Sequence, residues 1–133
     1  MRTADIMHTD LKTITPDALV TEAVDLMSEH HISGLPVVDV RGRLVGVISS
    51  TDILDATAEA DDPGAREQVF DNTTVAELMT PRPATVLAET DVMEAARHML
   101  YLEVHRLFVE DGGQLAGVIS GSDIVAAVAT AKL

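Results

Sequence analysis

The sequence has 133 residues, 47% of them hydrophobic and 23% charged, which is enough for one core of ordinary size or two small half-cores that support each other. A formal charge of −13 and an aromatic content of 2% argue against nucleic acid as a partner, because such binding needs cations for phosphates and rings for bases. Cysteine is absent, which excludes disulfides and thiolate metal sites, and no apolar run is long enough for a membrane span or signal peptide, so we expect a cytoplasmic protein.

The chain contains one unit twice. Placing Ala4 on Ala76 aligns the two halves at a constant offset of 72, which becomes 71 after a one-residue deletion in a turn. The tetrapeptide Gly-Val-Ile-Ser then recurs at 46–49 and 117–120. Self-similarity of this kind indicates a repeated supersecondary unit. We expect a first repeat at 1–55, an acidic connection at 56–73 and a second repeat at 74–133.

Each repeat begins with a short extended piece, near Thr13 to Thr15 in the first copy and near Thr85 to Leu87 in the second. A helix follows, because apolar residues recur at the i, i+3, i+4, i+7 spacing of one buried helix face. The residues on these two stripes are Val20, Ala23, Val24 and Met27, and Val92, Ala95, Ala96 and Met99. In the second copy, Asp91 and Glu94 predict a capping box at the start of the helix.

A β-hairpin and a second helix complete the unit. Apolar runs at 35–38 and 44–48 flank a turn at 41–43, and the second copy has Asp-Gly-Gly at 111–113. The second helices follow from Asp52 and Asp123. The fold class is therefore α/β, with two β-α-β-β-α repeats related by pseudo-twofold symmetry. Since each repeat leaves an apolar sheet face uncovered, we expect them to pack through their sheets into one module.

These residues resemble the cystathionine-β-synthase (CBS) domain over nearly the whole chain. The resemblance lies in Leu-Pro-Val-Val-Asp at 35–39, in Gly-Arg-Leu-Val-Gly-Val-Ile-Ser-Ser-Thr-Asp-Ile-Leu at 42–54 and in Gly-Val-Ile-Ser-Gly-Ser-Asp-Ile-Val at 117–125. The second copy departs from it by having Phe108 in place of Pro36. The resemblance implies a non-catalytic regulatory module that binds AMP, ADP, ATP or S-adenosylmethionine in clefts between two repeats. It also implies a homodimer and a regulated partner protein.

The Ser-x-x-Asp sequences at 49–52 and 120–123 each end a strand and open a helix. Free amides and the helix dipole favour an anion there, and a carboxylate can accept hydrogen bonds from a ribose diol. An equally simple alternative is that both are capping boxes with no ligand. The resemblance implies ribose contacts for the aspartates and a nearby phosphate for the serines and Thr51. The ligand-binding residues that we predict are Thr13, Ile14, Pro36, Ser49, Thr51, Asp52, Val86, His105, Arg106, Ser120, Ser122 and Asp123.

His105 and Arg106 form a basic pair before the second hairpin, where the first repeat has Ser33 and Gly34. The pair resembles one that contacts phosphate in nucleotide-sensing members of the family, although a surface pair is often only solvated. Possible helpers are Lys12, Arg41 and Arg43. Because only the second repeat offers adjacent cations on an acidic chain, we expect unequal clefts, with tighter phosphate binding beside this pair.

Other chemistry is weakly supported. His30 and His31 point about 100° apart on a helix, which suits a helix C-terminus better than a metal, so we expect no metal site. No nucleophile elbow, phosphate loop or dinucleotide fingerprint is present, so we expect no catalytic residue. The methionines at 7, 27, 79, 93 and 99 are predicted to fill the core. Three hypotheses remain: a sensor of adenosine-containing ligands, a ligand-free interaction module, and an unrecognised hydrolase or metal enzyme.

Overall fold

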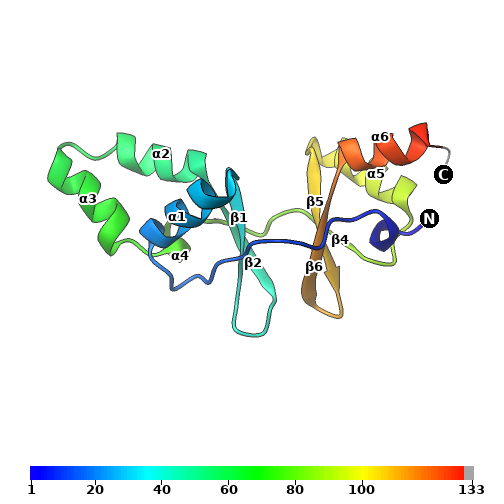
Figure 1. The fold of residues 1–133 in the computed structure, drawn as a ribbon, viewed down its shortest axis with the longest axis horizontal. Coiled ribbons are helices and arrows are strands. Elements are labelled where there is room, and N and C mark those ends of the chain that lie inside the picture. The colour runs from blue at the N-terminus through cyan, green and yellow to red at the C-terminus, as the bar shows by residue number, and fades with distance from the viewer. Residues whose placement is uncertain (131–133) are drawn as a thin grey trace. The chain divides into compact units, whose positions relative to one another are not determined.

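The computed structural model describes residues 1–130 and divides into two compact units. The N-terminal unit comprises Lys12–Arg82. The C-terminal unit combines residues 1–11 with the described part of 83–133, so the first eleven residues pack with the second repeat rather than with the first. In Figure 1 this segment is the blue chain that lies beside β6.

The N-terminal unit contains the first hairpin, its two helices and the connection. Its elements are α1 (Val20–His30), β1 (Gly34–Val38), β2 (Leu44–Ser49), α2 (Ser50–Ala58), α3 (Pro63–Asn72), α4 (Val75–Leu78) and β3 (Thr80–Pro81). The strand order is β1-β2-β3, with both pairings antiparallel. Ile14 extends the sheet by a parallel bridge to Val37.

The C-terminal unit repeats this plan. Its elements are the 3-10 turn η1 (Thr3–Asp5), β4 (Thr85–Leu87), α5 (Val92–Leu102), β5 (Arg106–Asp111), β6 (Gln114–Ser120) and α6 (Gly121–Ala129). Here β4 runs parallel to β5, and β5 runs antiparallel to β6. His8 bridges Val118 on the outer edge of β6, as β3 pairs with β2 in the other unit. The predicted α/β class and the two β-α-β-β-α repeats are confirmed.

Local signals explain where the helices begin and end. His31 and Glu103 occupy equivalent C-cap positions in the left-handed conformation, with φ of 54° and 57°. His30 and His31 therefore lie at the C-terminal end of α1, where the sequence predicted them. The capping box expected at Asp91 and Glu94 does not form among the described residues. The Asp91 carboxylate instead accepts the N–H of Met93 at 3.0 Å, one position earlier than a box requires.

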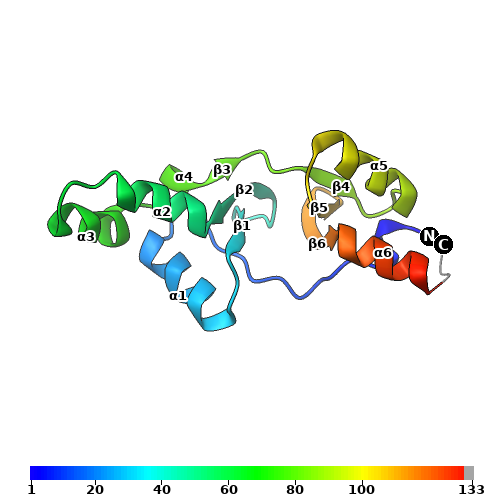
Figure 2. The same cartoon turned by 90° about the horizontal axis from the view of Figure 1, so that it is seen from above.

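The acidic connection contains a helix that its composition did not reveal. Asp62 caps α3 by accepting the N–H of Ala65 at 2.7 Å, and Pro63 takes the first helical position, where its missing N–H costs nothing. Phe70 of α3 packs on the core cluster of the N-terminal unit. The helix α3 itself contacts α1 and α2, and Figure 2 shows it beyond the end of α2. Within residues 1–130, no helix is both long and apolar enough to cross a membrane.

Each unit has its own hydrophobic core, built from equivalent positions. Leu35 and Ile48 are fully buried in one unit, and Leu107 and Ile119 in the other. Four of the five methionines predicted as core residues are buried or pack against a core cluster. Met93 is the exception, because its side chain is 43% exposed on α5.

Candidate functional site

The first Ser-x-x-Asp turn joins β2 to α2. The Asp52 carboxylate accepts the Ser49 N–H at 2.8 Å and the Ser49 hydroxyl at 3.0 Å, both through Oδ2. The Ser49 Oγ accepts the Asp52 N–H at 3.2 Å, which closes the predicted capping box. Oδ1 of Asp52 meets only the Thr80 hydroxyl among residues 1–130, at 3.5 Å. One carboxylate oxygen therefore holds the cap, and the other is almost free to accept a hydrogen bond.

The second turn joins β6 to α6 and has the same cap. Oδ2 of Asp123 accepts the Ser120 N–H at 2.8 Å, and the Ser120 Oγ accepts the Asp123 N–H at 3.2 Å. Its Oδ1, however, lies 2.7 Å from Nε2 of His8. Partial burial tends to raise the pKa of Asp123, but the Ser120 N–H and the His8 contact outweigh burial and hold the pKa below its usual value.

Each aspartate is contacted by a residue near the start of the other repeat. His8 contacts Asp123, and Thr80 contacts Asp52. We call residues 1–11 and 73–82 the arms. Each arm pairs antiparallel with the second strand of the hairpin in its unit and passes close to a glycine, Gly117 for the first arm and Gly46 for the second. A Cβ at Gly117 would lie 2.6 Å from the His8 carbonyl oxygen, so glycine permits this approach. Thr80 and His8 are related by the repeat offset of 72, but the repeat alignment alone did not identify either as a site residue.

The other predicted site residues lie in three places. Ile14 is buried and donates its N–H to the Pro36 carbonyl at 3.1 Å, while Thr13 beside it is exposed. Val86 is half-buried on β4. Thr51 and Ser122 occupy equivalent exposed positions in the first turns of α2 and α6, where their hydroxyls can reach a ligand.

The basic pair does not adjoin Asp123 within the C-terminal unit. His105 and Ser122 line one hollow beside α6, with Gly121, Val125 and Ala126. Asp123 and His8 line a different hollow, with Met1, Asp5, Ile6 and part of α6. Arg106 is exposed at the first position of β5. The unit thus presents His105 and Asp123 in two hollows that share Ala126 of α6.

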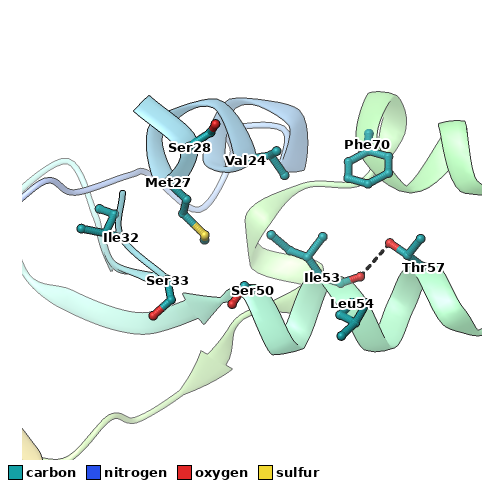
Figure 3. A pocket seen from close by; sticks show the side chains of 10 residues that line it. All are labelled: Val24, Met27, Ser28, Ile32, Ser33, Ser50, Ile53, Leu54, Thr57 and Phe70. Carbon is teal, nitrogen blue, oxygen red and sulfur yellow. Dashed lines mark hydrogen bonds between the residues drawn. The ribbon is translucent and has the colours of Figure 1, made fainter. Parts of the chain in front are cut away.

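An apolar pocket of about 470 Å³ lies elsewhere in the N-terminal unit, among α1, α2 and α3 (Figure 3). The residues lining it are Val24, Met27, Ser28, Ile32, Ser33, Ser50, Ile53, Leu54, Thr57 and Phe70. The Thr57 hydroxyl donates to the Ile53 carbonyl at 2.8 Å, which satisfies that hydroxyl within α2. Neither Ser49 nor Asp52 lines the pocket, but Ser50, which stands between them in the sequence, does.

The CBS domain family model matches residues 4–59 and 75–130. This chain belongs to the CBS domain family. Its CBS domains are 31% identical to CBSX1, a chloroplastic CBS domain-containing protein of Arabidopsis thaliana, over 92% of this chain and 61% of CBSX1. They also match the zinc metalloprotease MJ0392 of Methanocaldococcus jannaschii, at 32% identity over the whole chain and 34% of that enzyme. The chain spans less than two thirds of the length of these relatives.

Solved structures of CBS proteins share the fold. A crystal structure of CBSX2 in complex with AMP aligns with a TM-score of 0.77 at 32% identity, over 99% of this chain and 98% of CBSX2. The Hypoxic Response Protein I, solved with two coordinated zinc ions, aligns with a TM-score of 0.75 at 26% identity, over 95% of this chain and 98% of that one. In the CBS pair described here, residues 1–130 hold no group of three or more His, Cys, Asp or Glu side chains placed to bind a metal.

Proposed function

We propose that this CBS pair is a regulatory module that binds an adenosine-containing ligand, with AMP the first to be tested, at its two Ser-x-x-Asp turns. The observation that carries the proposal is the free Oδ1 of Asp52, since Oδ2 alone completes the cap. A cap needs one carboxylate oxygen, whereas a vicinal diol needs an acceptor that the protein has left available. The AMP complex of CBSX2 supports the choice of ligand.

The phosphate is assigned to groups on the helix N-termini and to the basic pair. Thr51 and Ser122 expose hydroxyls at the starts of nine-residue helices, whose free amides favour an anion. Arg106 supplies a positive charge and His105 a further hydrogen-bonding group on a chain whose formal charge is −13. ADP, ATP and S-adenosylmethionine carry the same ribose diol and form the rest of the ligand set.

The module is proposed to act without catalysis, by changing its contacts with a separate protein in the cytoplasm. Its match to MJ0392 leaves about two thirds of that enzyme outside the alignment, which supports a regulatory rather than a catalytic role for the shared part. We further propose a homodimer through α5 and α6. Their apolar side chains Leu100, Val125 and Val128 are 79%, 67% and 54% exposed, and such a patch favours burial against a second copy.

Titration calorimetry with AMP tests the binding proposal. Wild type should bind, and replacing both aspartates (Asp52→Ala with Asp123→Ala) should weaken binding at least about tenfold, because each loss removes a charge-assisted hydrogen bond. Arg106→Ala should weaken AMP binding by roughly 10- to 150-fold by the same arithmetic. Asp55→Ala, at an exposed position of α2, removes one carboxylate outside the Ser-x-x-Asp turns and should bind as wild type does.

The competing function, a ligand-free interaction module in which the serines and aspartates only cap helices, gives the opposite result. Thermal unfolding would then be unchanged by AMP, ADP, ATP or S-adenosylmethionine. A ligand at 100 times its dissociation constant should instead raise the free energy of unfolding by about 2.7 kcal/mol. An unchanged melting temperature with all four ligands would mean that the serines and aspartates only cap helices.

A further inference from the structure

The backbone that carries His8 is held in place. The His8 N–H donates to the Val118 carbonyl and the Val118 N–H donates to the His8 carbonyl, both at 2.9 Å. The first arm passes so close to Gly117 that any Cβ added there would meet the His8 carbonyl oxygen. Since the main chain is fixed by two hydrogen bonds and by this contact, only rotation of the imidazole can change what it touches.

The imidazole occupies the carboxylate oxygen that the first repeat leaves free. Its Nε2 lies 2.7 Å from Oδ1 of Asp123, while Oδ2 is held by the Ser120 N–H. The Asp123 side chain is only 17% exposed, whereas that of His8 is 69% exposed. Both oxygens of Asp123 are therefore engaged, and the exposed partner is the one that can leave.

The equivalent contact in the N-terminal unit is weak. Thr80 stands where the repeat places His8, and its hydroxyl approaches Oδ1 of Asp52 at 3.5 Å, near the limit of a hydrogen bond. A threonine hydroxyl is also neutral at every physiological pH, whereas an imidazole gains a proton between about pH 5 and 8. The two repeats thus differ in one side chain at one carboxylate oxygen.

We propose that His8 is a specificity-determining residue that competes with the ligand's vicinal diol for Oδ1 of Asp123, so that the second turn takes this ligand only when the imidazole swings away. This inference rests on the proposed function of the Ser-x-x-Asp turns. The first turn, with Thr80, accepts the same diol without such competition. The module therefore has one open site and one site closed by its own arm.

The competition depends on pH. Among residues 1–130, the other residues with charged groups that line this hollow are Asp123 of α6, Asp5 of η1 and Met1, which carries the α-amino group. Asp5 is engaged by Arg2, through its N–H at 2.8 Å and its guanidinium at 3.6 Å, and the Met1 amino group lies 3.7 Å from Asp91. A protonated imidazole bonds a carboxylate more strongly than a neutral one, so the arm closes the second site more firmly as pH falls.

Titration calorimetry with AMP at pH 6 and pH 8, on proteins that keep one site, tests this inference. Asp52→Ala leaves the His8 site. Adding His8→Thr to this variant should tighten AMP binding about tenfold at pH 6 and less at pH 8. Asp123→Ala leaves the Thr80 site, and adding Thr80→His there is the matched control. It should weaken binding, mostly at pH 6, and thermal melts should show all four variants folded.

Each result decides a different question. If His8→Thr leaves the AMP affinity unchanged at both pH values, or weakens it, His8 does not compete with the ligand and the inference fails while the proposed function stands. If wild type and every variant give no AMP binding heat at either pH, the proposed function itself fails, and the inference fails with it.

Discussion

The helix pair α1–α2 of the N-terminal unit and the pair α5–α6 of the C-terminal unit occupy equivalent positions, but within residues 1–130 only the first pair is covered by a further helix of its own unit. Phe70 of α3 packs against the first pair. The second pair presents Leu100 and Val128 where the first has Ser28 and Thr57. At these two positions the covered face is polar and the uncovered face is apolar, although Leu54 on the covered face is 66% exposed. This difference supports the proposed dimer through α5 and α6.

The likeness of the two units is tested first through their cores. Leu35 and Leu107 are equivalent and fully buried, so Leu35→Ala and Leu107→Ala should each lower the free energy of unfolding by about 2–5 kcal/mol. Urea denaturation of the two variants gives both values. If one substitution cost less than about 1 kcal/mol, the two cores would not be equivalent in packing, whatever their sequence similarity.

The difference between the helix faces is tested by exchanging residues between repeats. Leu100→Ser with Val128→Thr gives α5 and α6 the residues of α1 and α2. Because these side chains are exposed within their own unit, the fold should survive while the proposed dimer weakens by about 100-fold, equivalent to about 2.7 kcal/mol. Sedimentation at micromolar concentration measures the effect. A wild-type monomer of 14.2 kDa would contradict the proposed dimer.

The smallest expected effect compares the two glycines, Gly117 and Gly46, that lie beside the arms. Gly117→Ala forces a Cβ toward a backbone oxygen at 2.6 Å, whereas Gly46→Ala meets the Met79 sulfur at 2.6 Å and the Thr80 oxygen at 3.0 Å. A methionine side chain can move and a hydrogen-bonded main chain cannot do so cheaply. We expect about 1–3 kcal/mol of destabilisation at Gly117, with a smaller loss at Gly46, by thermal melts. Equal losses of stability in the two variants would mean that both arms can shift to make room for the added Cβ.

Much of the fold could be predicted from the repeated periodicities. The stripes beginning at Val20 and Val92 and the hairpin turns lie where expected, because they are set by local patterns. Met93 was misplaced because it follows Val92 directly and so points off the buried stripe. The helix α3 was missed because its sequence is polar and it starts from the modest signal of Asp62 and Pro63.

The candidate site was predictable only in part. Ser49 with Asp52, and Ser120 with Asp123, form the capping boxes that the sequence offered as one interpretation. Their use by a ligand stays a prediction. The contact of His8 with Asp123 joins residues 115 positions apart, and no local sequence pattern predicts such a pair. It depends on the arm packing with the second repeat, which the repeat boundaries did not suggest.

The packing of the arms also limits when the sheet of each unit can be completed during synthesis. The first arm is synthesised more than a hundred residues before its strand partner Val118. The N-terminal unit likewise lacks the strand at Thr80 until the connection has been made. A fragment ending at residue 59, where the first family match stops, would therefore carry an unpartnered arm and an open sheet edge. We therefore expect neither repeat, cut at its sequence boundaries, to fold on its own.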